Sequence, residues 1–281
     1  PFLFAVYKNS GVTKPIFCVP TGLYLENLLA KSVKKERGAP FTFGCVSTDT
    51  YRKNLRKLVN AFCQKYGNNP DFQLKLHVKY NLIPYEETLE DYIKKLNVDN
   101  VLLTSDEMEA EEYEDFLGSL DCYVLLSTSE GFSNTPREAL ALGIPCIITN
   151  NTGHIAICNS GFVVPIACLD EIPARHELRD LPLLPMCKQY DCRIPDVIAA
   201  MEEVVHNYDF HKQKALQGRE WVKQYLWPAL HDSYVTLLRP ERVAMARENK
   251  IDAMTKTIYT NDELLYKKIQ RLIFDRQRLK S

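Results

Sequence analysis

The sequence predicts an α/β protein with a doubly wound parallel sheet, followed by C-terminal helices. Strand-like and helix-like segments alternate along the chain, and the strand-like segments are short and mostly apolar. Strands are expected over 41–46, 72–78, 101–103, 123–126, 146–149 and 161–165, and helices over 54–66, 87–96, 111–120 and 135–143. Such sheets bind ligands beyond the carboxyl ends of their strands, which is where the loops discussed below lie.

Composition excludes several classes of protein. The chain has 281 residues and a formal net charge of −1, so nothing in it indicates nucleic-acid binding. Its nine cysteines are scattered and form no C-x-x-C, which makes zinc unexpected and favours reduced thiols in an intracellular protein. No apolar run is long enough to span a membrane and no signal peptide is visible, so a cytoplasmic location is expected.

The first half of the chain contains one clear helix and two weaker segments. Residues 1–7 are apolar and aromatic, which suggests a strand or the end of one, and 25–40 reads as an exposed connection. The helix expected over 54–66 has an apolar face at helical spacing, formed by Leu55, Leu58, Val59 and Phe62. Apolar and polar residues alternate over 72–78, as is typical of a strand.

The second half ends in helices. In the segment 111–120, the side chains expected to point inward are Tyr113, Phe116, Leu117 and Leu120. Residues 166–193 show no period and are expected to be irregular, whereas 195–205 and 211–225 are expected to be helical. A polar, basic helical segment then carries an apolar stripe, which is expected to pack on a neighbouring domain or chain or, alternatively, to contact a membrane surface. The stripe consists of Leu265, Ile269, Leu272 and Ile273.

The chain is organised around residues 127–149, which have the pattern of strand end, glycine loop, helix and next strand. Gly131 permits a sharp turn, Thr135 suits the N-cap and Pro136 the first turn, and Gly143 ends the helix. The amides before the helix then point outward, where the helix dipole adds about half a positive charge. Such a helix start binds phosphate.

Two carboxylates, Glu130 and Glu138, flank this loop. A carboxylate repels phosphate but accepts hydrogen bonds well from sugar hydroxyls. The pair therefore suggests a ligand with phosphate in the middle and a sugar at each end.

The residue order E-G-F-x-N-x-x-x-E-A-x-A-x-G-x-P over 130–145 resembles the signature of family 4 retaining glycosyltransferases of the GT-B fold. The resemblance implies a Rossmann-like donor domain and hexosyl transfer from a UDP- or GDP-linked sugar. By position, Glu138 would hold the ribose hydroxyls and Glu130 would lie by the transferred sugar as a catalytic group. The loop residues of the donor site would be Phe132, Ser133, Asn134 and Thr135, the last three through backbone N–H groups.

A second motif supplies a cation. The chain has no Asp-x-Asp metal motif, so cations and the helix dipole are expected to stabilise the leaving diphosphate without a metal. Residues 51–54 resemble the family's R-K-N motif, which implies that Lys53 binds the diphosphate and is catalytic; the alternative is a solvated lysine on a helix. The family usually has a second cation, an Arg, directly after the strand expected over 41–46. This chain has Ser47-Thr48-Asp49 there, with no cation, and Thr48 is expected to be a donor-site residue. Arg52 offers a substitute, although a neighbouring helical position is expected to point it elsewhere.

The remaining site residues rest on the resemblance as well. Leu103 and Thr104 would contact the base through their backbones, and no residue in the sequence indicates whether that base is guanine or uracil.

The acidic run 106–115 is expected to be a solvated helix face capped by Ser105 or Asp106. Ile157 stands where the family often has a Glu, and His154, a lone loop histidine, is expected to be solvated. No covalent glycosyl-enzyme step is expected.

Residues 14–24 resemble the family's linker into its C-terminal domain. The implied layout is the end of an upstream domain and linker over 1–24, the donor domain over 25–225, and a helical segment over 226–281. The acceptor, a glycan, lipid or other molecule, would bind mainly to an upstream Rossmann-like domain or partner chain that lies before Pro1. Two other readings stay open: a non-catalytic module that binds nucleotide sugars, and a scaffold that binds none.

Overall fold

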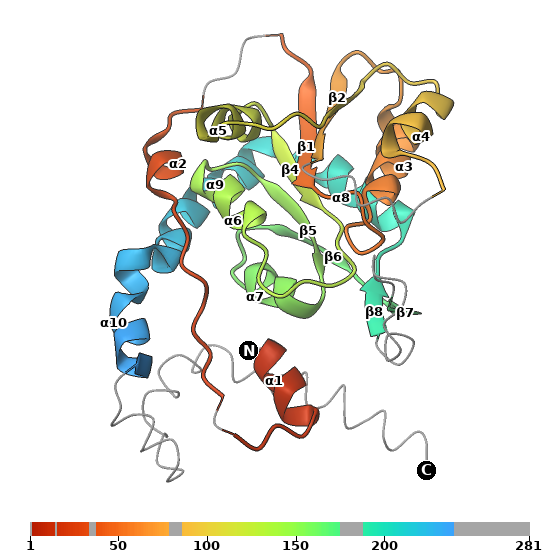
Figure 1. Ribbon diagram of the computed structural model, residues 1–281. Helices are drawn as coiled ribbons and strands as arrows, with labels where there is room; N and C mark the ends of the chain where they lie inside the picture. Colours follow the sequence, from red (N-terminus) through yellow and green to blue (C-terminus); the bar gives the residue numbers. More distant parts are fainter. Residues whose placement is uncertain (1, 15, 34–37, 79–85, 175–187, 239–281) are drawn as a thin grey trace. The chain divides into compact units, whose positions relative to one another are not determined.

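The computed structural model describes residues 2–14, 16–33, 38–78, 86–174 and 188–238 (Figure 1). The chain divides into two compact units, one formed by residues 23–226 and the other by 1–22 together with 227–281.

The larger unit contains a six-stranded sheet in the order β3-β2-β1-β4-β5-β6, and every pairing in it is parallel. The strands are β1 (Phe41–Ser47), β2 (Phe72–Val78), β3 (Val101–Thr104), β4 (Cys122–Leu125), β5 (Cys146–Asn150) and β6 (Val164–Ala167). The chain builds outward from β1 in one direction and then returns to β4 on its other side. The order therefore reverses between β1 and β4, which makes this pair the topological switch point.

Helices cover both faces of the sheet. The pair α3 and α8 lies on one face, and the pair α6 and α9 lies on the other (Figure 1). The helices of this unit are α2 (Glu26–Ala30), α3 (Leu55–Tyr66), α4 (Leu89–Lys95), α5 (Ala110–Gly118), α6 (Thr135–Ala141), α7 (Ile155–Cys158), α8 (Ile194–His206) and α9 (Tyr208–Val222), with short 3-10 turns η1 (Thr152–His154) and η3 (Lys223–Tyr225). The predicted doubly wound α/β fold is confirmed.

The core lies between these layers, and its central strands are apolar on both sides. Phe43 of β1, Tyr123 of β4 and Ile147 of β5 are fully buried. Such continuous burial is typical of a parallel sheet covered on both faces, and it explains why these strands read as apolar runs. The eight described cysteines are all free thiols.

Three sequence predictions for this unit are wrong. Residues 25–30 are not an exposed connection, because they form α2 and its N-cap, with Leu28 of the helix and Leu25 at the N-cap both buried. The last strand of the parallel sheet begins at Val164 rather than at 161, since Gly161 has a φ of +79°, which a strand does not accommodate. The segment 166–193 is not wholly irregular, since β7 (Asp170–Pro173) and β8 (Lys188–Asp191) pair as antiparallel strands.

The smaller unit contains α1 (Phe2–Asn9) and α10 (Trp227–Leu238). The expectation of a strand over 1–7 is wrong, because a short apolar run without alternation suits a helix equally well. Gly22 lies against the Trp227 ring, and Tyr234 donates a hydrogen bond to the Pro20 carbonyl at 2.9 Å. The stripe from Leu265 to Ile273 lies outside the described residues. None of the described helices is both long and apolar enough to cross a membrane.

Candidate functional site

Two loops meet at the switch point of the sheet. One follows β1 and contains Arg52 and Lys53, and the other follows β4 and contains Glu130. The Thr128 amide of the second loop donates to the Arg52 carbonyl of the first at 2.8 Å. This is the position at which sheets of this topology bind their ligands.

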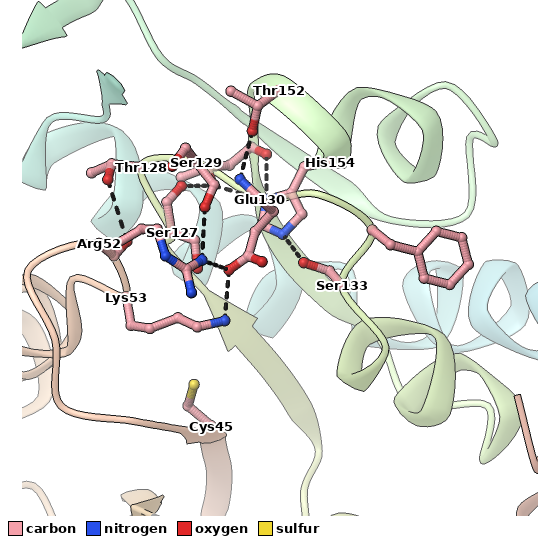
Figure 2. A network of polar contacts seen from close by, with 12 residues as sticks. Cys45, Arg52, Lys53, Ser127, Thr128, Ser129, Glu130, Ser133, Thr152 and His154 are labelled. Carbon is pink, nitrogen blue, oxygen red and sulfur yellow. Dashed lines mark hydrogen bonds and ion pairs between the residues drawn. The ribbon is translucent and has the colours of Figure 1, made fainter. Parts of the chain in front are cut away.

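Glu130 joins the two loops electrostatically (Figure 2). Its Oε1 accepts from Lys53 Nζ at 2.6 Å and from Arg52 Nη1 at 2.7 Å. Arg52 Nη1 also donates to the Ser129 carbonyl at 2.9 Å. Two cations therefore share one carboxylate oxygen, and the Glu130 side chain is only 9% exposed.

The charge state of Glu130 follows from these neighbours. Burial by itself would raise the pKa of Glu130, but the positive charges of Lys53 and Arg52 outweigh it and hold the pKa below its ordinary value. Glu130 is therefore a carboxylate at neutral pH. The site contains two cations and one anion before any ligand is bound.

Arg52 points toward the site, contrary to the sequence prediction. Residues 51–54 form a turn before α3 rather than its first helical turn, so Arg52 and Lys53 both reach the same carboxylate. Asn54 has a φ of +59°, and its side chain donates to Asp191 Oδ1 at 2.8 Å. Lys57 holds the other oxygen of Asp191 at 2.5 Å. Asp191 thus anchors the turn that presents the two cations.

The glycine loop leads into α6 as predicted, with a shift of one residue at its start. The N-cap is Asn134 rather than Thr135, and Pro136 lies in the first turn. At the other end, Gly143 has a φ of +69° and the Ile144 amide donates to the Ala139 carbonyl at 3.0 Å, which confirms the glycine stop. Within the described part of the chain, no acceptor is hydrogen-bonded to the amides of residues 133–135.

Arg137, which the sequence analysis did not single out, lies buried beneath this loop. Its Nη1 donates to the carbonyls of Phe132 and Ser133, the latter at 2.8 Å. The guanidinium carbon lies 3.8 Å from the centre of the Phe132 ring and 4.5 Å from that of Tyr225. Burial lowers the pKa of Arg137, against an opposing contribution from Tyr225. Arg137 therefore connects the loop before α6 to Tyr225 through its hydrogen bonds and its ring contacts.

Replacing Arg137 with Met should lower the free energy of unfolding by about 3 kcal/mol. The variant leaves two loop carbonyls without their charged donor and removes the contact with both rings. Urea unfolding of both proteins measures the loss. The matched control is R193M, since Arg193 is an exposed residue that pairs with Asp196 at 2.9 Å, and its loss should change stability by less than about 1 kcal/mol. Equal effects of the two substitutions would contradict this account of Arg137.

His154 is not solvated, contrary to expectation. It is fully buried in η1, directly after β5, and its Nε2 lies 2.8 Å from Ser133 Oγ (Figure 2). Its Nδ1 lies 3.1 Å from the Thr149 carbonyl. Because β4 and β5 are adjacent strands, the loops that follow them meet here. Gly153 makes this possible, since a Cβ there would lie 2.3 Å from the Gly131 carbonyl oxygen.

Burial lowers the pKa of His154 to about 4, although Glu130 and the Thr149 carbonyl act in the opposite direction. Below an unfolded pKa of about 6.5, the unfolded chain takes up a proton that the folded chain does not. Stability should therefore fall as the pH drops from about 6.5 to about 4, by up to about 3 kcal/mol.

Urea unfolding across this range tests the prediction. The advantage of the wild type over H154Q should shrink as the pH falls, whereas H231Q, at an exposed histidine, should follow the wild type. A constant difference between the wild type and H154Q would count against a suppressed His154 pKa.

The other predicted site residues lie at the same edge of the sheet. Glu138 accepts a hydrogen bond from the Tyr113 hydroxyl of α5. Thr104 ends β3, where its hydroxyl lies 3.0 Å from His77 Nδ1, with Leu103 before it. Thr48 directly follows β1. The N-cap of α5 is Glu109, in a capping box with Glu112, rather than Ser105 or Asp106.

No group of three or more His, Cys, Asp or Glu side chains in the described part of the chain is arranged to hold a metal ion.

Comparisons with known proteins agree with this architecture. Residues 29–165 match the family model described as "Glycosyl transferases group 1". No curated protein matches the chain. Sucrose-phosphate synthase from Thermosynechococcus elongatus superposes with a TM-score of 0.65 at 17% identity, over 87% of this chain and 57% of that one.

Two further structures show the same fold. HepE from Anabaena, in complex with UDP-glucose, has a TM-score of 0.58 at 13% identity, over 77% of this chain and 55% of its own. The α,α-trehalose 6-phosphate synthase from Burkholderia multivorans has a TM-score of 0.56 at 13% identity, over 83% and 51%. This chain spans about half the length of these three structures.

Proposed function

We propose, from the match of residues 29–165 to the glycosyl transferases group 1 family model, that the chain is the donor-binding half of a retaining, metal-independent glycosyltransferase. Its substrate would be a nucleoside-diphosphate sugar, and the acceptor would bind mainly to an upstream domain or a partner chain. The buried free thiols support a cytoplasmic location.

The observation that carries the proposal is the cluster of Arg52, Lys53 and Glu130 at the switch point of the sheet. A diphosphate needs positive charge, and two cations converge there within 2.7 Å of a single oxygen. The donor sugar needs hydrogen-bond acceptors for its hydroxyls, which Glu130 provides. Glu138 would take the ribose on the other side of the loop.

The chemistry assigned to these groups follows from the charges. As the bond between the sugar C1 and the phosphate oxygen breaks, negative charge grows on the diphosphate, and Lys53 and Arg52 stabilise it. The Glu130 carboxylate stabilises positive charge that develops on the sugar ring. The acceptor oxygen bonds to C1 from the face that the diphosphate leaves, and its proton passes to the leaving phosphate. Groups that act more strongly on the transition state than on the ground state raise the rate.

A thermal-shift panel of UDP, GDP, ADP and dTDP tests the proposal on the purified chain. One base should stabilise the protein by about 2.7 kcal/mol at a hundred times its dissociation constant. The UDP-glucose complex of HepE makes UDP the first nucleotide to try. No response to any of the four would contradict the proposal and favour a scaffold.

A non-catalytic nucleotide-sugar module is the second reading, and it predicts the same binding. Radiolabelled sugar transfer by the chain joined to its upstream domain separates the two. Transfer that depends on Lys53 identifies an enzyme, whereas binding without transfer identifies a module.

A further inference from the structure

Ser133 has an unusual backbone for a residue with a side chain. Its φ is +63°, in the left-handed region that disfavours any residue carrying a Cβ. The residue lies in the loop before α6, where its amide is among those assigned to the donor. A conformation of this kind persists only where the surroundings impose it.

Two buried side chains hold Ser133. Arg137 donates to its carbonyl at 2.8 Å. His154 Nε2 lies 2.8 Å from its hydroxyl (Figure 2). Both side chains are 1% exposed or less. They come from different elements, so the loop after β4 is fixed both by its own helix and by the turn after β5.

The hydrogen bonds of His154 determine its tautomer. Nδ1 lies 3.1 Å from the Thr149 carbonyl oxygen, which can only accept, so Nδ1 carries the proton. The Thr149 hydroxyl, also 3.1 Å from Nδ1, donates instead to the Ser127 carbonyl at 2.7 Å. Nε2 is therefore an acceptor, and the Ser133 hydroxyl is its donor.

We propose that His154 is a positioning residue: its neutral Nδ1–H tautomer holds Ser133 in the left-handed conformation and so aims the amides of residues 133–135 at the donor. The inference rests on the proposed function for the identity of the ligand. It assigns to that site a residue, His154, that acts through Ser133 and does not itself contact the ligand. The Gly153 amide reinforces the contact by donating to the Glu130 carbonyl at 2.8 Å.

Substitution of Ser133 by Ala and by Gly separates this role from a direct contact. Both variants lose the hydroxyl, but only Gly adopts the left-handed region without penalty. Affinity for UDP and GDP, measured by calorimetry on the full chain, should be about tenfold weaker for S133A than for S133G. Equal affinities would overturn the inference. S119A, at the opposite edge of the sheet, is the matched control and should bind as the wild type does.

His154 is tested in two ways. H154Q keeps an acceptor near the Nε2 position and should lose less affinity than H154L. Independently of any nucleotide, ¹⁵N NMR of the histidine rings at pH 7 should show His154 with a protonated Nδ1 and a bare Nε2. The signal is assigned by its absence from H154Q.

The outcomes distinguish the two claims. A wild type that binds none of UDP, GDP, ADP and dTDP contradicts the proposed function, and the inference then has no ligand. An Nε2–H tautomer or an imidazolium overturns the positioning role even if nucleotide binds normally. Nucleotide binding with an Nδ1–H tautomer and a weaker S133A supports both.

Discussion

Substitution of Lys53 by Met should weaken the binding of the preferred nucleoside diphosphate by about a hundredfold. A cation about 4 Å from a phosphate oxygen contributes roughly 4 kcal/mol at an effective dielectric of 20. Desolvation of Lys53 and the remaining charge of Arg52 offset part of this, which leaves about 2.7 kcal/mol, or two orders of magnitude. Sugar transfer by the proposed glycosyltransferase should fall further, because the charge on the leaving diphosphate grows in the transition state.

Calorimetric titration with the nucleotide chosen by the thermal-shift panel measures the affinity. K65M is the matched control, since Lys65 lies near the other end of α3 and pairs with Glu202. It removes the same charge and should leave the affinity within a factor of two. A K53M protein that binds as tightly as K65M would remove Lys53 from the diphosphate site and leave the motif at 51–54 without a role.

The sequence located the charged groups of this site but not the way they are held. Lys53 and Glu130 follow the ends of buried apolar strands, so the rule for parallel sheets places both at the same edge. The orientation of Arg52 was predicted wrongly because the turn at 51–54 ends in a left-handed Asn54, whose partner Asp191 lies 137 residues further along the chain. The residues around Asn54 give no indication that its partner is so distant in the sequence.

The buried supports of the loop were harder to find. Arg137 stands in an apolar helix, and its partners Trp221 and Tyr225 come from the end of α9 and the turn after it. The contact of His154 with Ser133 could have been predicted from the sequence. Because β4 and β5 are consecutive and adjacent, the loops after them must meet, and a histidine in one loop faces a serine in the other. The expectation of a strand over 1–7 failed for a different reason, since a short apolar run without alternation suits helix and strand alike. The expectation of an exposed connection over 25–40 missed the helix α2 and its buried Leu28.

Substitution of Glu130 by Gln should tighten the binding of the nucleoside diphosphate by at least tenfold. In the free protein, Oε1 of Glu130 neutralises Lys53 and Arg52 together at 2.6 and 2.7 Å. An incoming diphosphate competes for the same two cations and meets the negative charge of the carboxylate. At about 6 Å and an effective dielectric of 20, that repulsion is roughly 3 kcal/mol for each pair of charges. Gln keeps the shape of the side chain and removes the charge.

Sugar transfer by the same variant should change in the opposite direction and fall by about a hundredfold. The donor develops positive charge on its sugar ring only as the bond to phosphate breaks, and Gln offers that charge no counter-ion. A variant that binds the product more tightly yet reacts more slowly has lost an interaction made mainly in the transition state. Without ligand, E130Q should unfold at a lower urea concentration, since it leaves two partly buried cations without their partner.

Calorimetry with the nucleoside diphosphate and a transfer assay on the complete enzyme give the two readouts. E220Q is the matched control, because Glu220 is an exposed residue of α9 that pairs with Lys223 at 2.7 Å, and both readouts should stay at their wild-type values. Weaker nucleotide binding by E130Q would mean that Glu130 contacts the nucleotide directly and that its two ion pairs do not compete with the diphosphate. Normal transfer would remove the charge of Glu130 from the reaction, since Gln keeps the size and shape of the side chain without its charge.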